Sequence, residues 1–328
     1  MKSVYIYPTY TPNRDKSGNL YIKYFHEAFK SSGWKVCNRL WYIGIFSLFA
    51  NLNTRLFIIQ WIDLLPKKRF GKIQFVFFVI GILFLKLINR RVLWVLHNKK
   101  AHNGDSLWVD WGMSFMAKFS DYVLTHSEEG VSFFNQNYPK HQGKCFYIPH
   151  PVYSSKIYKS QIEKWDYVIW GSISPRKNVA EFLEFAHNND FFRKQKILIC
   201  GRCSNREYAR RIEMSCGDNI TFENRFLTDS ELSERIRCSK CVVFTYLPDS
   251  VLSSGALIYS INFCKPIIGP KVGSFEDLKD IVKCYDTFED IPNIKLFNNE
   301  SACVQYIKEN TWSALPEKVE SMLKEMER

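Results

Sequence analysis

The sequence predicts an α/β protein with two Rossmann-like, doubly wound domains that face a cleft. At 328 residues the chain is too long for one ordinary core and suits two domains of roughly 150 residues each. Apolar runs of strand length alternate with helical segments in both halves, as in repeated βαβ units. We interpret Pro149-His150-Pro151 as a hinge between the halves. The predicted domains are 1–153 and 154–310, followed by a C-terminal helical segment at 311–328.

The first half opens with a βαβ unit. Residues 3–7 form the predicted first strand, and a polar loop follows from Pro8 to Gly18. A helix is expected over 19–32, because its apolar residues recur at helical spacing and Gly33 stops it. The next strand begins at Trp34.

Residues 41–88 are heavily apolar, and 73–88 is predicted to be a helix. This segment resembles a membrane span but falls short of the ~20 residues that a bilayer requires. Gln74 and Lys86 also interrupt it, so we do not expect it to be transmembrane. Basic residues flank it: Lys67, Lys68, Arg69, Lys72, Arg90 and Arg91. Two interpretations stay open, a helix that presses a basic, aromatic rim against anionic lipid and a wholly buried crossover helix.

A predicted buried strand at 92–96 delivers a polar loop at its carboxyl end, where active sites of open α/β sheets collect. The loop contains His97, His102 and Asp105. His102 is the preferred general base because imidazole titrates near neutrality, and Asp105 suits the same role if its pocket shifts its pKa. His97 lies directly at the strand end, and its alternative role is to hold the loop by hydrogen bonds. The next candidates are Asp110 and Asp15.

Later segments continue the alternation. Strands are predicted at 122–127, 146–148, 167–170, 196–200, 220–222, 241–246 and 266–270, most of them separated by helices. The last two strands enclose the turn Ser253-Ser254-Gly255 and a short helix. The first N–H groups of a helix have no internal partner and carry the positive end of its dipole, so this turn predicts a diphosphate site. The alternative is an N-cap at Ser253 and close packing at Gly255.

The net charge of +12 is concentrated in the first half. Lys and Arg outnumber Asp and Glu by 20 to 8 over residues 1–153, whereas each class numbers 25 over residues 154–328. A basic half indicates an anionic partner such as nucleic acid, an acidic membrane surface or a phosphorylated lipid. No nucleic-acid-binding signature accompanies it, so the expected partner is an anionic membrane surface and no nucleic acid is expected.

Two C-x-x-C pairs occur among the ten cysteines, at Cys200/Cys203 and Cys238/Cys241. Such pairs can build a zinc site. Cys200 closes one apolar run and Cys241 opens another, so we interpret both as small core residues of strands. Zinc is the minority interpretation.

Four segments together resemble the GT-B glycosyltransferases of the broad family 4 type, in particular bacterial capsule and exopolysaccharide enzymes. They are 124–130, 148–151, 171–178 and 254–268, and the resemblance covers nearly the whole chain. It implies a nucleotide-sugar donor on the second domain, an acceptor on the first, and a last helix that crosses back onto the first domain.

The resemblance also implies a donor site. In this group a Gly-x-x-x-x-x-Lys turn, here Gly171 to Lys177, holds the donor diphosphate. The Arg that the group carries in this turn falls on Ser172, so Arg176 or Arg202 is the expected source of the missing charge. The implied donor-binding residues are Gly171, Ser172, Arg176, Lys177, Arg202, Tyr246, Ser253, Ser254 and Gly255.

A second departure concerns catalysis. Retaining members carry two Glu residues eight positions apart, and those positions hold Val251 and Tyr259 here. We therefore favour inversion at the anomeric carbon, which needs a base on the acceptor side. The expected catalytic residues are His102, Asp105 and His97. No metal is expected, because positive charge and the helix end stabilise the departing diphosphate and the sequence has no Asp-x-Asp motif.

The predicted function is a glycosyltransferase of hexosyltransferase type in surface polysaccharide synthesis. Its donor would be a UDP- or GDP-sugar, with no further cofactor, and its acceptor an oligosaccharide on a polyprenyl diphosphate. With no signal peptide recognised, the expected location is the cytoplasm, peripheral on the inner face of the plasma membrane. Two alternatives stay open: a GT-B-like epimerase or phosphorylase, and a non-catalytic nucleotide-sugar or polyanion-binding partner in a capsule assembly complex.

Overall fold

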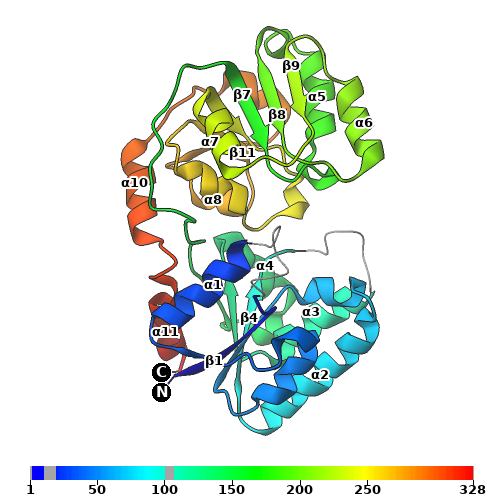
Figure 1. Ribbon diagram of the computed structural model, residues 1–328, viewed down its shortest axis with the longest axis vertical. Coiled ribbons are helices and arrows are strands. Elements are labelled where there is room, and N and C mark those ends of the chain that lie inside the picture. The colour runs from blue at the N-terminus through cyan, green and yellow to red at the C-terminus, as the bar shows by residue number, and fades with distance from the viewer. Residues whose placement is uncertain (1, 11–19, 100–106, 328) are drawn as a thin grey trace. The chain divides into compact units, whose positions relative to one another are not determined.

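The chain folds into two compact units, each built on one six-stranded sheet (Figure 1). The computed structural model describes residues 2–10, 20–99 and 107–327. Unit 1 comprises Met1–Pro151 and Asn310–Arg328, and unit 2 comprises Val152–Glu309. All strand pairs within both sheets are parallel among the described residues. The predicted α/β class with two doubly wound sheets is confirmed.

Unit 1 has the strand order β2-β1-β3-β4-β5-β6. Its strands are β1 Ser3–Tyr7, β2 Lys35–Val36, β3 Leu56–Gln60, β4 Arg91–Leu96, β5 Tyr122–Thr125 and β6 Cys145–Tyr147. Its α-helices are α1 Leu20–Ser31, α2 Gly71–Leu87, α3 Leu107–Phe119, α4 Glu128–Asn137 and α11 Leu315–Met326, with 3-10 segments η1 Trp41–Asn51, η2 Ile62–Lys67 and η3 Pro139–His141. All five residues of β3 are buried, so this strand lacks the polar alternation that would separate it from the apolar sequence around it.

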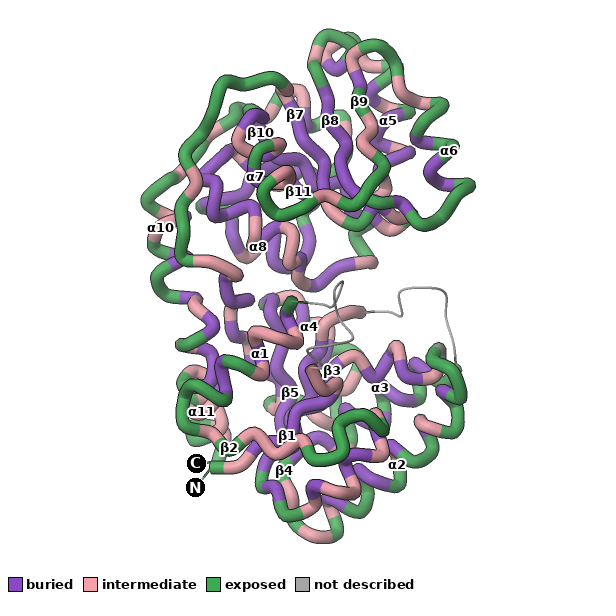
Figure 2. Tube along the Cα trace, in the orientation of Figure 1, coloured by how far each residue is buried: buried purple, intermediate pink, exposed green. Residues whose placement is uncertain are grey.

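Helix α2 occupies the segment predicted as a helix after the apolar region. Phe75, Phe78, Ile82 and Leu85 are at most 1% exposed and pack into unit 1. Other positions of the helix are exposed, and buried and exposed residues alternate along it in Figure 2. The alternative of a wholly buried crossover helix is therefore wrong. Among the described residues, no helix combines the length and apolarity needed to cross a bilayer.

Unit 2 has the strand order β12-β11-β10-β7-β8-β9. Its strands are β7 Trp165–Trp170, β8 Ile197–Cys200, β9 Ile220–Glu223, β10 Ser239–Val243, β11 Ile267–Pro270 and β12 Val282–Tyr285. Its α-helices are α5 Val179–His187, α6 Arg206–Met214, α7 Asp229–Arg237, α8 Gly255–Ile261, α9 Ser274–Asp277 and α10 Glu300–Glu309, and its 3-10 segments are η4 Pro175–Lys177, η5 Phe192–Lys194, η6 Pro248–Ser250 and η7 Phe288–Asn293. Apolar clusters cover both faces of its sheet, as a parallel sheet requires.

The last segment of the chain belongs to unit 1. The chain leaves this unit after Pro151 and returns at Asn310. The ring of Trp312 lies 5.0 Å from that of Tyr21 in α1, measured between centroids. The Glu327 carboxylate accepts a hydrogen bond of 2.6 Å from the Tyr122 hydroxyl in β5. Aromatic packing and this hydrogen bond therefore attach the C-terminal helix to the first sheet.

Candidate functional site

The strand order of unit 2 places its topological switch point between β7 and β10. The chain runs from β7 outward to β8 and β9, then returns to lay β10 on the other side of β7. The chain leaves β7 toward one edge of the sheet and leaves β10 toward the other edge, so the loops after these two adjacent strands diverge. Ligands of open α/β sheets bind between two such loops. The loop after β7 contains the predicted Gly171–Lys177 turn, and the loop after β10 contains Tyr246 and leads to α8.

The Lys177 ammonium is buried beneath the turn that follows β7. Its side chain ends 2.6 Å from the backbone carbonyl oxygen of Trp170, to which Nζ donates a hydrogen bond. Gly171 has φ +110°, and a Cβ at this position would lie 2.7 Å from that Nζ. Lys177 is only 5% exposed, and no ion pair joins it to a carboxylate among the described residues. A buried cation without a counter-ion is costly alone and favours an anionic ligand.

Tyr246 connects this lysine to the start of α8. The Lys177 Nζ lies 5.1 Å from the centroid of the Tyr246 ring, and the Arg176 guanidinium lies 5.8 Å from it. The Tyr246 hydroxyl lies 3.2 Å from the Ser254 hydroxyl, at hydrogen-bond distance. Burial raises the pKa of Tyr246, but the charge of Lys177 and the hydrogen bond with Ser254 outweigh it, so the net pKa is lowered. The positive charge beside the Tyr246 hydroxyl therefore lowers its pKa by more than burial raises it.

The start of α8 shows the capping and close packing that the sequence offered as the alternative to a diphosphate site, with the cap one residue later than expected. Ser254, not Ser253, is the N-cap, and its hydroxyl accepts a hydrogen bond of 3.3 Å from the Leu257 N–H. Gly255 is tightly packed, because a Cβ there would lie 2.9 Å from the Tyr153 hydroxyl. The Ser253 hydroxyl oxygen is buried and has no hydrogen-bond partner among the described residues. Such a group is normally satisfied, so Ser253 is the serine of this turn with capacity for a ligand.

The remaining predicted donor residues, Ser172 and Arg202, are exposed on two neighbouring loops. The Ile173 N–H donates to the Arg202 carbonyl at 3.0 Å, which joins the loops after β7 and β8. Gly201 has φ +135°, and a Cβ there would lie 1.9 Å from the Gly171 carbonyl oxygen. The structure therefore brings Gly171, Arg176, Lys177, Tyr246 and Ser254 into one cluster, whereas the side chains of Ser172 and Arg202 make no contact with it that the structure records.

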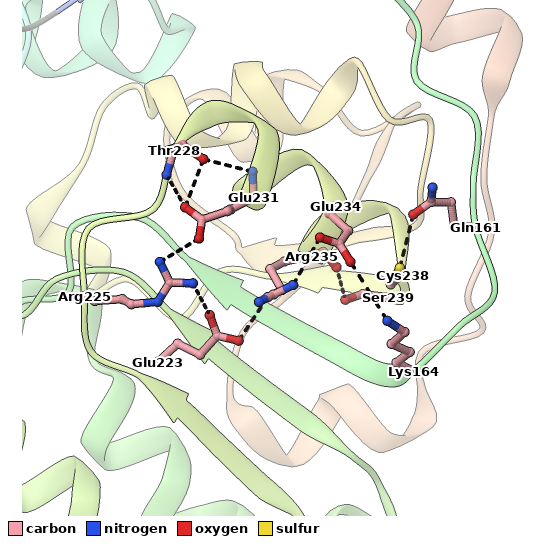
Figure 3. A network of polar contacts seen from close by, with 10 residues as sticks. All are labelled: Gln161, Lys164, Glu223, Arg225, Thr228, Glu231, Glu234, Arg235, Cys238 and Ser239. Carbon is pink, nitrogen blue, oxygen red and sulfur yellow. Dashed lines mark hydrogen bonds and ion pairs between the residues drawn. The ribbon is translucent and has the colours of Figure 1, made fainter.

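The loop after β9 was not predicted from the sequence to contribute to a binding site. Glu223 at the end of β9 pairs with Arg235 at 2.9 Å, and Arg225 pairs with Glu231 at 2.8 Å (Figure 3). Thr228 and Glu231 add a capping box at the start of α7. Phe226 is 71% exposed on the loop that these contacts brace. An exposed aromatic ring on a fixed loop at a strand carboxyl end suits stacking against a planar ligand, and no local sequence pattern marks it.

Of the predicted catalytic residues, only His97 can be placed. His102 and Asp105 lie outside the described residues, as does Asp15. His97 Nε2 lies 3.1 Å from Oε1 of the buried Gln60, and its ring stacks on Trp61 with centroids 4.1 Å apart. Because Oε1 only accepts, His97 Nε2 donates this hydrogen bond. His97 is therefore held in one orientation, as its alternative loop-holding role requires.

A second histidine cluster adjoins His97. His126 Nδ1 lies 2.8 Å from the Ile148 carbonyl and donates to it, so Nε2 accepts from the Tyr21 hydroxyl at 2.7 Å. The Tyr21 ring lies 5.0 Å from that of His97. Burial lowers the pKa of His126 to about 4 and that of His150 to about 3. Both rings are neutral at physiological pH. His126 fixes the Tyr21 hydroxyl by its hydrogen bond, and the His150 ring packs 5.3 Å from the Tyr21 ring.

The cysteines do not form the zinc site of the minority interpretation. Cys200 and Cys241 are each 0% exposed and belong to apolar clusters on opposite faces of the sheet. Cys203 shares the cluster of Cys241, whereas Cys200 lies in the other cluster, so the four sulfurs do not meet at one site. Across residues 2–10, 20–99 and 107–327, no group of three or more His, Cys, Asp or Glu side chains is arranged to hold a metal ion.

Val251 and Tyr259 occupy the two positions at which the sequence comparison with retaining enzymes expects glutamates, and both have apolar surroundings. Val251 is 3% exposed, in the loop between β10 and α8. Tyr259 lies in α8 and packs its ring 5.3 Å from that of Trp170. Neither offers a carboxylate at this switch point.

Comparisons with known proteins identify the architecture. No protein-family model and no curated protein matches the sequence. Among solved structures, HepE from Anabaena in complex with UDP and glucose matches with a TM-score of 0.69 at 11% identity, over 99% of this chain and 100% of that chain. The lipopolysaccharide outer core galactosyltransferase WaaB matches with a TM-score of 0.60 at 11% identity, over 98% and 100%. AviGT4, a glycosyltransferase involved in Avilamycin A biosynthesis, matches with a TM-score of 0.59 at 11% identity, over 99% and 98%. The chain therefore has the GT-B fold, as the sequence predicted, and the narrower family 4 type stays a prediction.

Proposed function

We propose that this protein is a glycosyltransferase of hexosyltransferase type that takes its sugar from a nucleotide-sugar donor. The observation that carries the proposal is the buried Lys177 ammonium, which has no carboxylate counter-ion among the described residues and lies at the topological switch point of unit 2. A donor diphosphate supplies the missing negative charge. The shared fold with glycosyltransferases, one of them solved with UDP and glucose, supports this assignment.

In the proposed donor complex, the diphosphate contacts Lys177, Arg176 and the turn at Ser253–Gly255. The Ser253 hydroxyl, which has no partner among the described residues, donates to a phosphate oxygen. The base and ribose lie over the loops after β8 and β9, with Phe226 as a stacking surface. Because UDP is bound by the Anabaena neighbour, a UDP-sugar is the first donor to test and a GDP-sugar the second.

The proposed reaction inverts the anomeric carbon. A base in unit 1 accepts the proton of the acceptor hydroxyl as that oxygen attacks, and the bond to the donor diphosphate breaks. His97, His102 and Asp105 are the proposed catalytic residues, with His97 oriented by Gln60. The charge that develops on the departing diphosphate is stabilised by Lys177 and Arg176. The absence of acidic side chains at Val251 and Tyr259 supports inversion over retention.

We further propose that the acceptor is an oligosaccharide linked to a polyprenyl diphosphate in surface polysaccharide synthesis, such as that of a capsule. The charge excess of residues 1–153 supports an anionic, lipid-linked acceptor. This acceptor places the protein peripherally on the inner face of the plasma membrane.

The test is transfer from radiolabelled UDP- and GDP-sugars to polyprenyl-diphosphate oligosaccharides. The proposal expects label in the organic phase together with release of the nucleoside diphosphate. Tight donor binding without turnover on any acceptor would instead indicate the non-catalytic binding partner. Conversion of the free nucleotide-sugar without an acceptor would indicate an epimerase.

A further inference from the structure

Helix α2 is apolar on the side that faces away from unit 1. Its inward positions, among them Phe75, Phe78 and Ile82, are at most 1% exposed. Its outward positions are between 40% and 77% exposed, and they are Ile73, Val76, Phe77, Ile80, Leu83, Phe84 and Leu87. A helix that is apolar all round is normally buried all round, whereas this one has packed only one face. Its outward face therefore requires an apolar partner.

Tryptophans of α3 continue this apolar area. Trp108 is 38% exposed and Trp111 51% exposed, and each ring lies 5.7 Å from that of Phe75. We call the seven outward residues of α2, together with Trp108 and Trp111, the α2 surface. Helices α2 and α3 lie side by side in unit 1 (Figure 1). Nine exposed apolar side chains on two adjoining helices exceed the scattered apolar exposure of an ordinary soluble surface.

Cations outnumber carboxylates around the α2 surface, where Asp110 of α3 is an exposed carboxylate between the two tryptophans. Between Asp63 and Asp105 there are nine Lys and Arg residues and no Asp or Glu. Lys72 is exposed, with its ammonium 6.0 Å from the centroid of the Trp108 ring. Arg69 is exposed at the amino end of the helix, whereas at its carboxyl end Lys86 pairs with Asp121 at 2.5 Å and Arg90 donates to the Leu52 carbonyl, so Arg69 and Lys72 are the cations of this rim. Apolar side chains with a cationic, tryptophan-containing rim are the pattern of a helix that lies in a bilayer interface.

We propose that the α2 surface docks this protein on an anionic lipid bilayer. Helix α2 lies parallel to the membrane, its outward apolar side chains enter the acyl boundary, and Arg69 and Lys72 contact lipid phosphates. One face of the helix stays packed on the sheet, which agrees with a length too short to span the bilayer. This inference deepens the proposed function, on which its biological role rests, because it brings unit 1 to a lipid-linked acceptor.

Charge decides between a membrane and a second copy of the chain. In a symmetric pair of α2 surfaces, the cationic rims of both copies would face each other. No carboxylate occurs between Asp63 and Asp105, and the exposed Asp110 of α3 supplies only one per copy against the exposed Arg69 and Lys72, so a pair of copies stays short of negative charge. An anionic bilayer supplies both the apolar layer and the opposite charge.

The test is sedimentation of the full chain with vesicles of phosphatidylcholine, with and without phosphatidylglycerol. The variant combines Ile73→Glu and Ile80→Glu, two outward residues that are 56% and 50% exposed. The control combines Ile162→Glu and Met214→Glu, each 88% exposed in unit 2, which changes the net charge equally. Circular dichroism and UDP binding establish that both variants fold.

Binding to phosphatidylglycerol vesicles is expected for the wild-type and control proteins, and at least ~tenfold weaker for the α2 variant. Lys72→Gln should weaken binding about fivefold at low salt and less at high salt. Wild-type protein that stays in the supernatant, or an α2 variant that binds as well as the control, overturns the proposal. A concentration-dependent dimer that Ile73→Glu with Ile80→Glu abolishes, without vesicle binding, assigns the surface to a second copy and also overturns it.

These results separate the docking proposal from the proposed function. Transfer to a water-soluble acceptor without vesicle binding would overturn only the docking. Vesicle binding without nucleotide-sugar binding would leave the docking in place and overturn only the glycosyltransferase assignment.

Discussion

Replacement of Lys177 by methionine tests whether its buried charge exists to hold a diphosphate. Methionine keeps most of the side-chain volume and removes the ammonium. Lys177 donates to the Trp170 carbonyl but forms no ion pair with a described carboxylate, so the lost hydrogen bond and the relieved desolvation oppose each other. We expect the free energy of unfolding without ligand to stay within about 1 kcal/mol of wild type.

The effect on ligand binding should be much larger. A charge-assisted hydrogen bond contributes about 1.5–3 kcal/mol, which corresponds to UDP binding about 10- to 150-fold weaker. Isothermal titration calorimetry measures this affinity, and thermal unfolding measures stability on the same samples.

Lys265→Met is the matched control. Lys265 is also 5% exposed, but it has a carboxylate partner, Glu163, at 3.7 Å and precedes β11 at the amino edge of the sheet. Its substitution should leave UDP affinity unchanged. Wild-type UDP affinity in folded Lys177→Met protein would refute the assigned role of Lys177.

Three further predictions concern stability and catalysis. The pKa of the His126 imidazole is about 4 in the folded protein and has its ordinary value in the unfolded chain. The contribution of neutral His126 to the free energy of unfolding is therefore fully present above pH ~6.5 and falls by about 3 kcal/mol as the pH is lowered toward 4. His126→Gln should flatten this part of a plot of unfolding free energy against pH, and an unchanged slope would contradict the assignment. Gly201→Ala should cost about 2–4 kcal/mol and weaken UDP binding, because its Cβ would meet the Gly171 carbonyl; a wild-type melting temperature would show that the loops yield freely. His97→Ala or His102→Ala should lower kcat by ~100-fold or more with UDP affinity retained, and full activity in both variants would place the base elsewhere.

The sequence predicted the strands and helices of unit 2 that position the proposed donor site. Gly171 and Lys177 are linked by local spacing, and the structure places the Lys177 ammonium beneath Gly171. The contact of Lys177 with Tyr246 crosses 69 residues of sequence, which no local pattern reveals. The N-cap of α8 could not be assigned from the sequence either, because Ser253 and Ser254 are the same residue type and only the backbone geometry at Ser254 distinguishes them.

Other elements were missed for identifiable reasons. Strand β3 is buried on both faces, so its sequence has no alternation, and the apolar run around it obscures its ends. Tyr21 and His126 are separated by 105 residues, so the hydrogen bond that joins them beside His97 depends on the fold alone. The outward face of α2 was predicted only as one of two alternatives, because an apolar helix gives no sign in sequence of which side is covered.

The central claim is that unit 2 holds a nucleotide-sugar. Thermal unfolding of the wild-type protein with UDP-, GDP- and dTDP-sugars tests it most directly, since a ligand that binds only the native state stabilises it by about 2.7 kcal/mol at 100 times its Kd. A concentration-dependent rise in Tm is expected for a UDP- or GDP-sugar, with a smaller rise in Lys177→Met. An unchanged Tm with every nucleotide-sugar at millimolar concentration would contradict the central claim.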